Sequence, residues 1–183
     1  SSGSGGMGGR GGAIALFSYG RVSRLFNSTL TQNYTGKGGR GASENFDGIG
    51  GDGGGIYSQE NGWIDVRMST IVDNRTYMRS YGSGPTHYIP AGHGAGIYVN
   101  HAELFSVVGS IISDNPREIL NGSGQPAIQW SDCAKMPGEG LQSLGFNVIR
   151  NPVDDTTVPN DNTYKFCVVT SSAGKYGPDI VGQ

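Results

Sequence analysis

The chain has 183 residues, of which 33 are glycine and 35% are hydrophobic, and its formal net charge at pH 7 is −2. So much glycine disfavours long helices and favours short strands with tight turns, because glycine weakens a helix interior and accepts positive φ without strain. The small negative charge provides no basic patch for a phosphate backbone, which argues against nucleic acid as the main partner. No apolar run in the sequence approaches the roughly 18 residues that a membrane-spanning helix needs.

Residues 1–10 are mostly glycine and serine, and we expect them to form a flexible linker or a Gly-rich loop that enters the first repeat. From residue 11 onward, a Gly-rich motif and an apolar motif that ends in asparagine occur three times in the same order. The three asparagines are Asn33, Asn74 and Asn115, and both intervals are 41 residues. The apolar residues Leu30, Ile71 and Ile112 keep the same interval. The chain is therefore a repeat protein.

The apolar positions within each repeat show no helical period, but they recur at the 41-residue interval. This pattern is expected if each repeat is one turn of a solenoid whose strands stack at about 4.8 Å, so that equivalent side chains form ladders. One turn of three short strands needs roughly 20 residues, so each repeat should contain one coil and one insertion. The insertions are 34–52, 75–92 and 116–125, and all three should emerge on one side.

The second insertion carries aromatic side chains with polar tips, which suit a binding surface formed by the loops of a solenoid. We predict that any ligand binds there, through Tyr77, Tyr81, His87 and Tyr88. The alternative is that these rings fold back and pack on the coil.

After residue 125 the strand-like alternation continues, but the 41-residue register is lost, which we interpret as a modified coil. This part of the chain holds the only two cysteines, Cys133 and Cys167. Two cysteines are too few for a structural zinc site, so a single disulfide is favoured. A disulfide would in turn imply an oxidising compartment.

Several motifs resemble those of bacterial surface proteins that belong to the pectin-lyase-like superfamily. Gly53-Gly-Gly-Ile-Tyr57 and Ser69-Thr-Ile-Val-Asp-Asn74 are similar to the Gly-Gly-x-Ile-Tyr and Ser-x-Ile-x-x-Asn repeats of these proteins. The C-terminal part resembles choice-of-anchor Q domain proteins in four motifs, namely Asp132-Cys133, Ser143-Leu-Gly-Phe-Asn-Val-Ile149, Cys167 and Gly177-Pro-Asp-Ile-Val-Gly182. A more distant similarity is to chlamydial polymorphic outer-membrane proteins.

Together with the repeat, this resemblance implies an all-β fold, a right-handed parallel β-helix with loop insertions on one face. It would cover residues 11–183 as a single domain and would be a fragment of a longer protein. The implied role is structural or adhesive, without catalytic chemistry, in a secreted or cell-surface protein. The expected partners are further coils of the same polypeptide or another protein at the helix ends, and polysaccharide. The alternative function is that of a carbohydrate-active lyase or hydrolase on the same fold.

The enzyme alternative depends on two acidic residues. Asp73 and Asp114 are 41 residues apart, so they could lie about 5 Å apart on adjacent coils, like the carboxylates of a retaining glycosidase. The other interpretations of this pair are a Ca²⁺ contact and a solvated face. Otherwise no cofactor is expected, and the histidines share no metal-ligand spacing. One column of strand positions holds Arg24, Asp65 and Ser106, which is not the recurring acidic or basic set usual for enzymes of this superfamily.

The repeated asparagines have two competing interpretations. Asn33, Asn74 and Asn115 would form a hydrogen-bonded ladder at a corner of the solenoid. Four asparagines also satisfy the N-glycosylation acceptor pattern, namely Asn27, Asn33, Asn74 and Asn121. An asparagine that is buried in a ladder cannot carry a glycan, so the interpretations exclude each other at Asn33 and Asn74. Asn121 lies in a Gly/Ser-rich stretch and is the best candidate acceptor.

Overall fold

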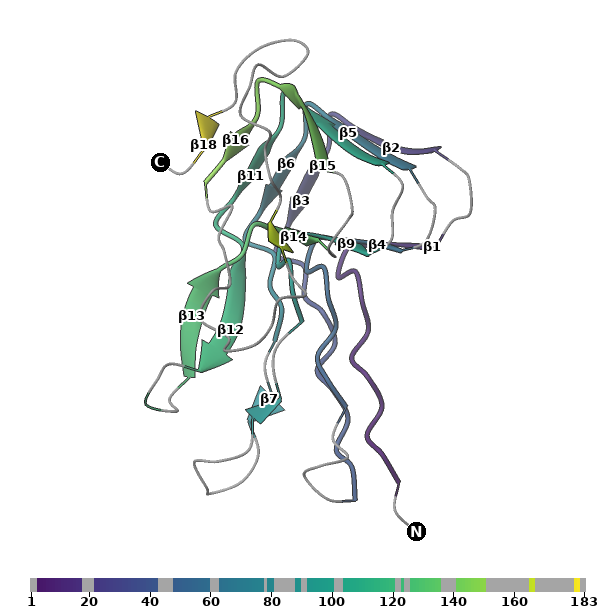
Figure 1. Cartoon of the computed structure of the whole chain (residues 1–183), viewed down its shortest axis with the longest axis vertical. Coiled ribbons are helices and arrows are strands. Elements are labelled where there is room, and N and C mark those ends of the chain that lie inside the picture. Colours follow the sequence, from purple (N-terminus) through teal and green to yellow (C-terminus); the bar gives the residue numbers. More distant parts are fainter. Residues whose placement is uncertain are drawn as a thin grey trace.

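The computed structural model of the protein is all β in the residues that it describes, which form no helix (Figure 1). These residues are 3–17, 22–42, 48–59, 63–77, 79–80, 88–89, 92–100, 104–120, 123, 126–135, 141–150, 165–166 and 180–181. Most of the strands lie in three sheets, which the chain visits in turn before it returns to the first one.

Parallel pairing dominates these three sheets. The first sheet contains β1 (Ile14–Phe17), β4 (Ile56–Gln59), β9 (Ile97–Asn100), β14 (Cys133–Lys135) and β17 (Lys165–Phe166). The second contains β2 (Val22–Phe26), β5 (Trp63–Arg67), β10 (Leu104–Val108) and β15 (Leu141–Gly145). The third contains β3 (Thr29–Thr31), β6 (Thr70–Val72), β11 (Ile111–Ser113), β16 (Val148–Ile149) and β18 (Ile180–Val181). Within these sheets only β14 and β17 are antiparallel.

The predicted 41-residue interval is the observed register of the second and third sheets over the first three coils. Trp63 pairs with Val22 on one side and with Leu104 on the other, and Ile71 pairs with Leu30 and Ile112. In the first sheet β1 pairs with β4 at a step of 42 residues, because the chain from Ile14 to Val22 is one residue longer than the equivalent chain from Ile56 to Trp63. The repeat therefore sets which strands are neighbours.

The three sheets face one another across a common apolar core, while they remain separate sheets (Figure 1). Side chains alternate along each strand, so Ile64 and Val66 of β5 are buried whereas Trp63 and Arg67 are exposed. The fully buried aliphatic residues include Ile56, Ile71, Ile97, Ile112 and Ile149. Equivalent residues of successive coils stack in this core, which is the arrangement that the apolar columns of the sequence predict.

The corner between the second and third sheets has left-handed backbone in every coil. The residues at this corner are Asn27, Met68, Gly109 and Phe146, with φ between 47° and 58°. Such a conformation costs on the order of 1–3 kcal/mol for a residue other than glycine. A serine follows the corner in the first three coils, and the hydroxyl oxygens of Ser69 and Ser110 accept hydrogen bonds from the backbone N–H of the serine one coil earlier. These hydrogen bonds between serines of successive coils therefore stabilise the sharp turn.

The fourth coil explains why the repeat disappears from the sequence after residue 125. β14, β15 and β16 pair with the third coil at shorter steps, with Cys133 opposite Ile97 and Ile149 opposite Ile112. A β-bulge falls between Val107 and Val108 where β10 meets β15. The parallel pairing therefore continues after the third repeat, at a step that is four or five residues shorter than 41.

The insertions leave the coils at one corner and project on the same side, as the sequence predicts (Figure 1). The second contains the hairpin of β7 (Arg79–Ser80) and β8 (Tyr88–Ile89), and the third is the hairpin of β12 (Pro116–Leu120) and β13 (Pro126–Trp130). The third insertion thus extends to residue 130, beyond the expected limit of 125, because β13 is the returning strand of this hairpin.

The Gly-rich N-terminal segment packs against the first insertion. Backbone N–H groups of Gly36, Gly39 and Ala42 donate to the carbonyl oxygens of Gly9, Gly6 and Gly3, respectively. This contact at every third residue matches polyproline II geometry, which has three residues per turn. Residues 3–9 therefore belong to the folded unit, which favours an entry loop over a linker.

Candidate functional site

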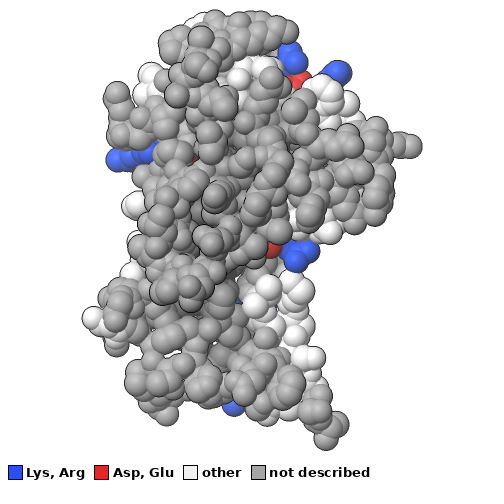
Figure 2. Space-filling view, in the orientation of Figure 1, with Lys and Arg blue, Asp and Glu red and all other residues white. Residues whose placement is uncertain are grey.

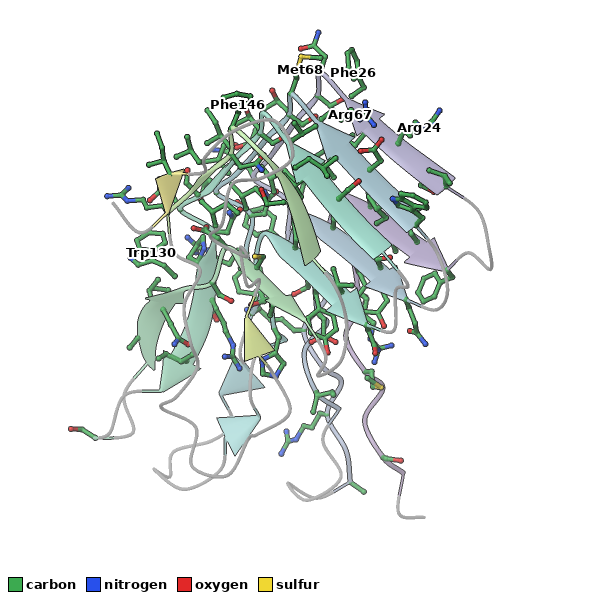
Figure 3. All side chains as sticks on the ribbon, turned by 45° about the horizontal axis from the view of Figure 1, so that its top comes forward. Arg24, Phe26, Arg67, Met68, Trp130 and Phe146 are labelled. Carbon is green, nitrogen blue, oxygen red and sulfur yellow. The ribbon has the colours of Figure 1, made fainter. Side chains whose placement is uncertain are left out.

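The outer face of the second sheet carries exposed aromatic, aliphatic and basic side chains. Val22 and Phe26 of β2 and Trp63 of β5 are 49%, 59% and 43% exposed. The largely exposed Arg24 lies between Val22 and Phe26 on β2, and the half-exposed Arg67 lies opposite Phe26 on β5. We call these five residues the outer-face patch. Arg24, Phe26 and Arg67 are labelled in Figure 3, and charged atoms of both signs lie at the upper right of Figure 2, where Figure 1 has the second sheet.

A buried carboxylate holds the basic part of the patch in place. Oδ2 of Asp65 lies 2.8 Å from Nε of Arg67 and 4.0 Å from Nε of Arg24, and the hydroxyl of Ser106 donates to Oδ1 at 3.0 Å. Burial alone would raise the pKa of Asp65, but the hydrogen bonds from Arg67 and Ser106 and the charges of Arg67 and Arg24 outweigh it and hold the pKa below its ordinary value. Asp65 is therefore ionised at neutral pH and orients Arg67 rather than exchanging protons.

The structure thus brings together Arg24, Asp65 and Ser106, which the sequence analysis placed in one column without assigning them to a site. The sequence analysis did not assign them to a site because the three residues differ in type, and it looked for one residue type that recurs in the column. The signal that could have found this face is the alternation of side chains along β2 and β5, which places Phe26 and Trp63 on the solvent-facing side of the sheet.

The two carboxylates of the enzyme alternative lie at another corner, after the third sheet. Asp73 and Asp114 occupy equivalent left-handed positions, with φ of 54° and 53°. Asp114 forms an ion pair with Arg150, at 2.6 Å between Oδ1 and a guanidinium nitrogen. Among the described residues no group of three or more potential metal ligands occurs. A catalytic role or a Ca²⁺ contact for this pair stays a prediction.

The repeated asparagines form a ladder through their side chains. Nδ2 of Asn33 donates to Oδ1 of Asn74 at 2.8 Å, and Nδ2 of Asn74 donates to Oδ1 of Asn115 at 3.0 Å. Asn74 and Asn115 are fully buried. The ladder therefore leaves no access for a glycan at Asn74, whereas Asn27 is exposed. Asn121 lies outside the described residues, and glycosylation stays a prediction.

The predicted ligand-binding loop is described in part. Tyr77 stacks on Tyr34 of the first insertion with ring centroids 5.5 Å apart, and the ammonium of Lys37 lies 4.7 Å from the centroid of the Tyr77 ring. Tyr77 thus packs against the neighbouring insertion, whereas the alternative interpretation expected these rings to pack on the coil. A binding role for the loop stays a prediction. Tyr81, His87 and the side chain of Tyr88 lie outside the described residues.

A second polar cluster lies at the base of the insertions and was not predicted as a unit. Asp52 accepts a hydrogen bond from the backbone N–H of His93 at 2.9 Å and lies 3.6 Å from Nε of Arg10. The pKa of Asp52 is raised, chiefly by burial. Burial, and then the charge of Arg117, lower the pKa of His93 to about 3, so His93 is neutral at physiological pH. Arg10 also donates to the hydroxyl of Tyr57, at 2.9 Å.

This cluster joins the N-terminal segment, the first sheet and the bases of two insertions. The ring of Tyr57 is fully buried and stacks on Tyr98 with centroids 5.8 Å apart. The polar side chains of this cluster bind to other groups of the protein. We therefore interpret the cluster as part of the packing between the insertions and the coils. Asp52 and His93 are 41 residues apart, so they occupy equivalent positions of successive repeats.

Of the predicted disulfide, Cys133 is described and Cys167 lies outside the described residues. Cys133 is buried in the core. No free cysteine occurs in the described part of the chain. The pairing with Cys167 stays a prediction.

Comparisons of the chain with protein-family models, with curated proteins and with solved structures find no match. In the part of the chain that the structure describes, no helix could cross a membrane.

Proposed function

We propose that the protein is a non-catalytic, secreted or cell-surface binding module, built as a right-handed parallel β-helix that displays an adhesive face on its second sheet. The fold proposal is supported by three parallel sheets that the chain visits in a fixed order and by strand pairs at a 41-residue step. The motifs that resemble those of bacterial surface proteins are consistent with this architecture.

The observation that carries the binding role is the outer-face patch. Its exposed side chains are Trp, Phe, Val and Arg, without lysine or glutamate. Trp, Phe and Arg are enriched in protein interfaces and Lys and Glu are depleted, because aromatic rings bury much area at a small cost in side-chain entropy and a guanidinium group forms several hydrogen bonds from one planar group. The patch lies on a hydrogen-bonded sheet, so its geometry is fixed before binding.

The charges of the patch favour binding over catalysis. The carboxylate at its centre is buried and already paired with Arg67, so neither a free general base nor a second carboxylate is available among the described residues of this face. The predicted partners, a protein or a polysaccharide at the surface and further coils at the helix ends, remain part of the proposal.

The test is binding to a panel of immobilised polysaccharides and extracellular proteins, scored for attachment and for cleavage. Trp63→Ala combined with Phe26→Ala should weaken attachment at least about tenfold, since such side chains act as hot spots. Ile111→Ala is the matched control, because Ile111 is a similarly exposed apolar residue on the third sheet. Equal loss in both variants would contradict the proposed face, and cleavage that Asp73→Asn abolishes would establish the enzyme instead.

A further inference from the structure

The corner between the second and third sheets forms a row of side chains next to the outer-face patch. Asn27, Met68, Gly109 and Phe146 occupy successive coils of this row, because the backbone N–H of each of the first three donates to the residue that precedes the corner in the next coil. Met68 and Phe146 are 55% and 59% exposed. Figure 3 labels both, together with Phe26, along this edge of the molecule.

Neither folding nor solubility accounts for Met68 and Phe146. Both have positive φ, 47° and 57°, where a residue with a Cβ atom is unfavourable and glycine is not. Both are large apolar side chains that gain little burial, since more than half of each is exposed. Residues with strained backbone whose cost is not offset by burial of the side chain are typical of functional positions.

Gly109 makes a notch between these two side chains. The other three coils carry a side chain at this corner in spite of the strained backbone, so Gly109 is the gap in the row. Among the described residues, a Cβ atom added to Gly109 would meet only Cγ of Met68, at 3.7 Å, so this part of the structure leaves the space above Gly109 open. Met68 and Phe146 belong to coils that are two positions apart, and their Cα atoms are therefore separated by roughly 10 Å. That gap has room for one apolar side chain.

The charge beside the notch is positive. Arg67 directly precedes Met68, and its side chain is 47% exposed, whereas its partner Asp65 is 7% exposed. Arg24 on the adjacent strand is 75% exposed. A partner that approaches the corner therefore meets two guanidinium groups and almost none of the carboxylate between them.

We propose that the notch of Met68, Gly109 and Phe146 is the docking point for a protein partner that inserts one apolar side chain and places an acidic residue against Arg67. This inference rests on the proposed binding function and specifies its partner. A flexible thioether and an aromatic ring line the notch, and both adapt to the apolar anchor residues through which proteins recognise one another. The neighbouring arginines then select for acidic residues beside the anchor.

The test uses a displayed library of random peptides, selected in parallel against the wild-type protein and Gly109→Asn. Asparagine tolerates the left-handed backbone, as Asn27 does at the same corner, so this change fills the notch with little effect on the fold. Asn27→Gly is the matched control in the first coil. We expect selection against the wild type and against Asn27→Gly to enrich peptides with one apolar residue flanked by acidic residues. These peptides should bind Gly109→Asn at least about tenfold more weakly than the wild type.

Methyl NMR then locates the selected peptide. The chain has four methionines, and the Met68 methyl signal is assigned with Met68→Leu. An enriched peptide should shift this signal more than the other three, and added salt should reduce the effect. Met68→Gly should keep or raise the melting temperature, because it relieves the backbone strain. The same change should weaken binding of the peptide, because it removes one wall of the notch.

Three results would overturn the proposal. The first is that the same peptides bind the wild type and Gly109→Asn equally. The second is that the Met68 methyl signal shifts with a polysaccharide but with no selected peptide, and the third is that the protein self-associates through this corner. These outcomes are separate from failure of the proposed function. If Trp63→Ala with Phe26→Ala abolishes attachment while Gly109→Asn has no effect, the binding face stands and only the notch is wrong.

Discussion

The carboxylate of Asp132 ends the asparagine ladder. Its Oδ1 accepts hydrogen bonds from both the backbone N–H and Nδ2 of Asn115, at 3.0 and 2.8 Å. Asn74 and Asn115 make the same pair of contacts to one another one coil earlier. Asp132 therefore occupies the fourth rung, although it is neither an asparagine nor 41 residues from the third rung.

Replacing this last rung tests how much the ladder contributes to stability. Asp132→Ala should lower the free energy of unfolding by about 1–3 kcal/mol, because it leaves the buried backbone N–H of Asn115 without its acceptor and leaves Nδ2 only the carbonyl oxygens of Ile71 and Ser113. Asp132→Asn should cost less, since an amide oxygen fills the same role at the earlier rungs. Urea unfolding of the two variants measures the difference, and equal destabilisation would show that charge rather than the acceptor matters.

The Gly-rich segments offer a matched pair of substitutions. A Cβ atom on Gly51 would lie 1.9 Å from the carbonyl oxygen of Gly9, whereas a Cβ atom on Gly9 would meet no atom of the described residues within 4 Å. Gly51→Ala should thus destabilise the contact between the N-terminal segment and the first insertion, by about 1–3 kcal/mol. Gly9→Ala should stay within about 1 kcal/mol of the wild type. Limited proteolysis of residues 1–10 and thermal unfolding report the effect, and similar behaviour of both variants would contradict this packing.

His93 should make the protein less stable in acid. Its pKa is lowered to about 3 in the folded state, from an ordinary value of 6.5. As the pH falls from about 6.5 to 3, the unfolded chain binds a proton at this residue while the folded protein does not, so stability falls by at most about 1.4 kcal/mol per pH unit. Above pH 6.5 the contribution is fully present. The raised pKa of Asp52 acts in the opposite direction, because its contribution is present at low pH and is lost as the pH rises through the folded value.

The comparison that isolates this effect is the free energy of unfolding of the wild type minus that of His93→Gln, measured at several pH values. Because Asp52 is present in both proteins, its contribution largely cancels. The difference should change steadily between pH 6.5 and 3 and be constant above pH 7. Parallel curves over the whole range would mean that His93 is not buried as a neutral ring.

The predicted disulfide rests on the cysteine count, and the strand pairing beside Cys133 is compatible with it. β14 and β17 are antiparallel, with Ala134 opposite Phe166. Cross-linking residues 34 positions apart should stabilise the protein by roughly 3–4 kcal/mol, so Cys167→Ser should lower the melting temperature and leave Cys133 as a thiol that reacts with an alkylating agent once the protein is unfolded. Two thiols that alkylate in freshly purified, denatured wild-type protein would exclude the bridge.

The sequence alone determined the repeat and its direct structural consequences. The 41-residue interval between Asn33, Asn74 and Asn115 located the stacked coils, the side on which the insertions project and the ladder, because parallel strands in register place equivalent residues side by side. Glycine content and the absence of a helical period likewise indicated the all-β fold.

Only the tertiary structure decided where unlike residues meet. Asp132 joins the ladder across a shortened coil, Arg10 reaches Tyr57 and Asp52 from a segment with the composition of a linker, and Arg24, Asp65 and Arg67 converge on one face. None of these contacts repeats along the coils, and the 41-residue interval indicated only that Arg24 and Asp65 are neighbours, not that they form an ion pair with Arg67 beside them. They depend on side-chain direction and on burial, and the strained exposure of Met68 and Phe146 at one corner becomes visible only when φ and solvent access are known for the same residues.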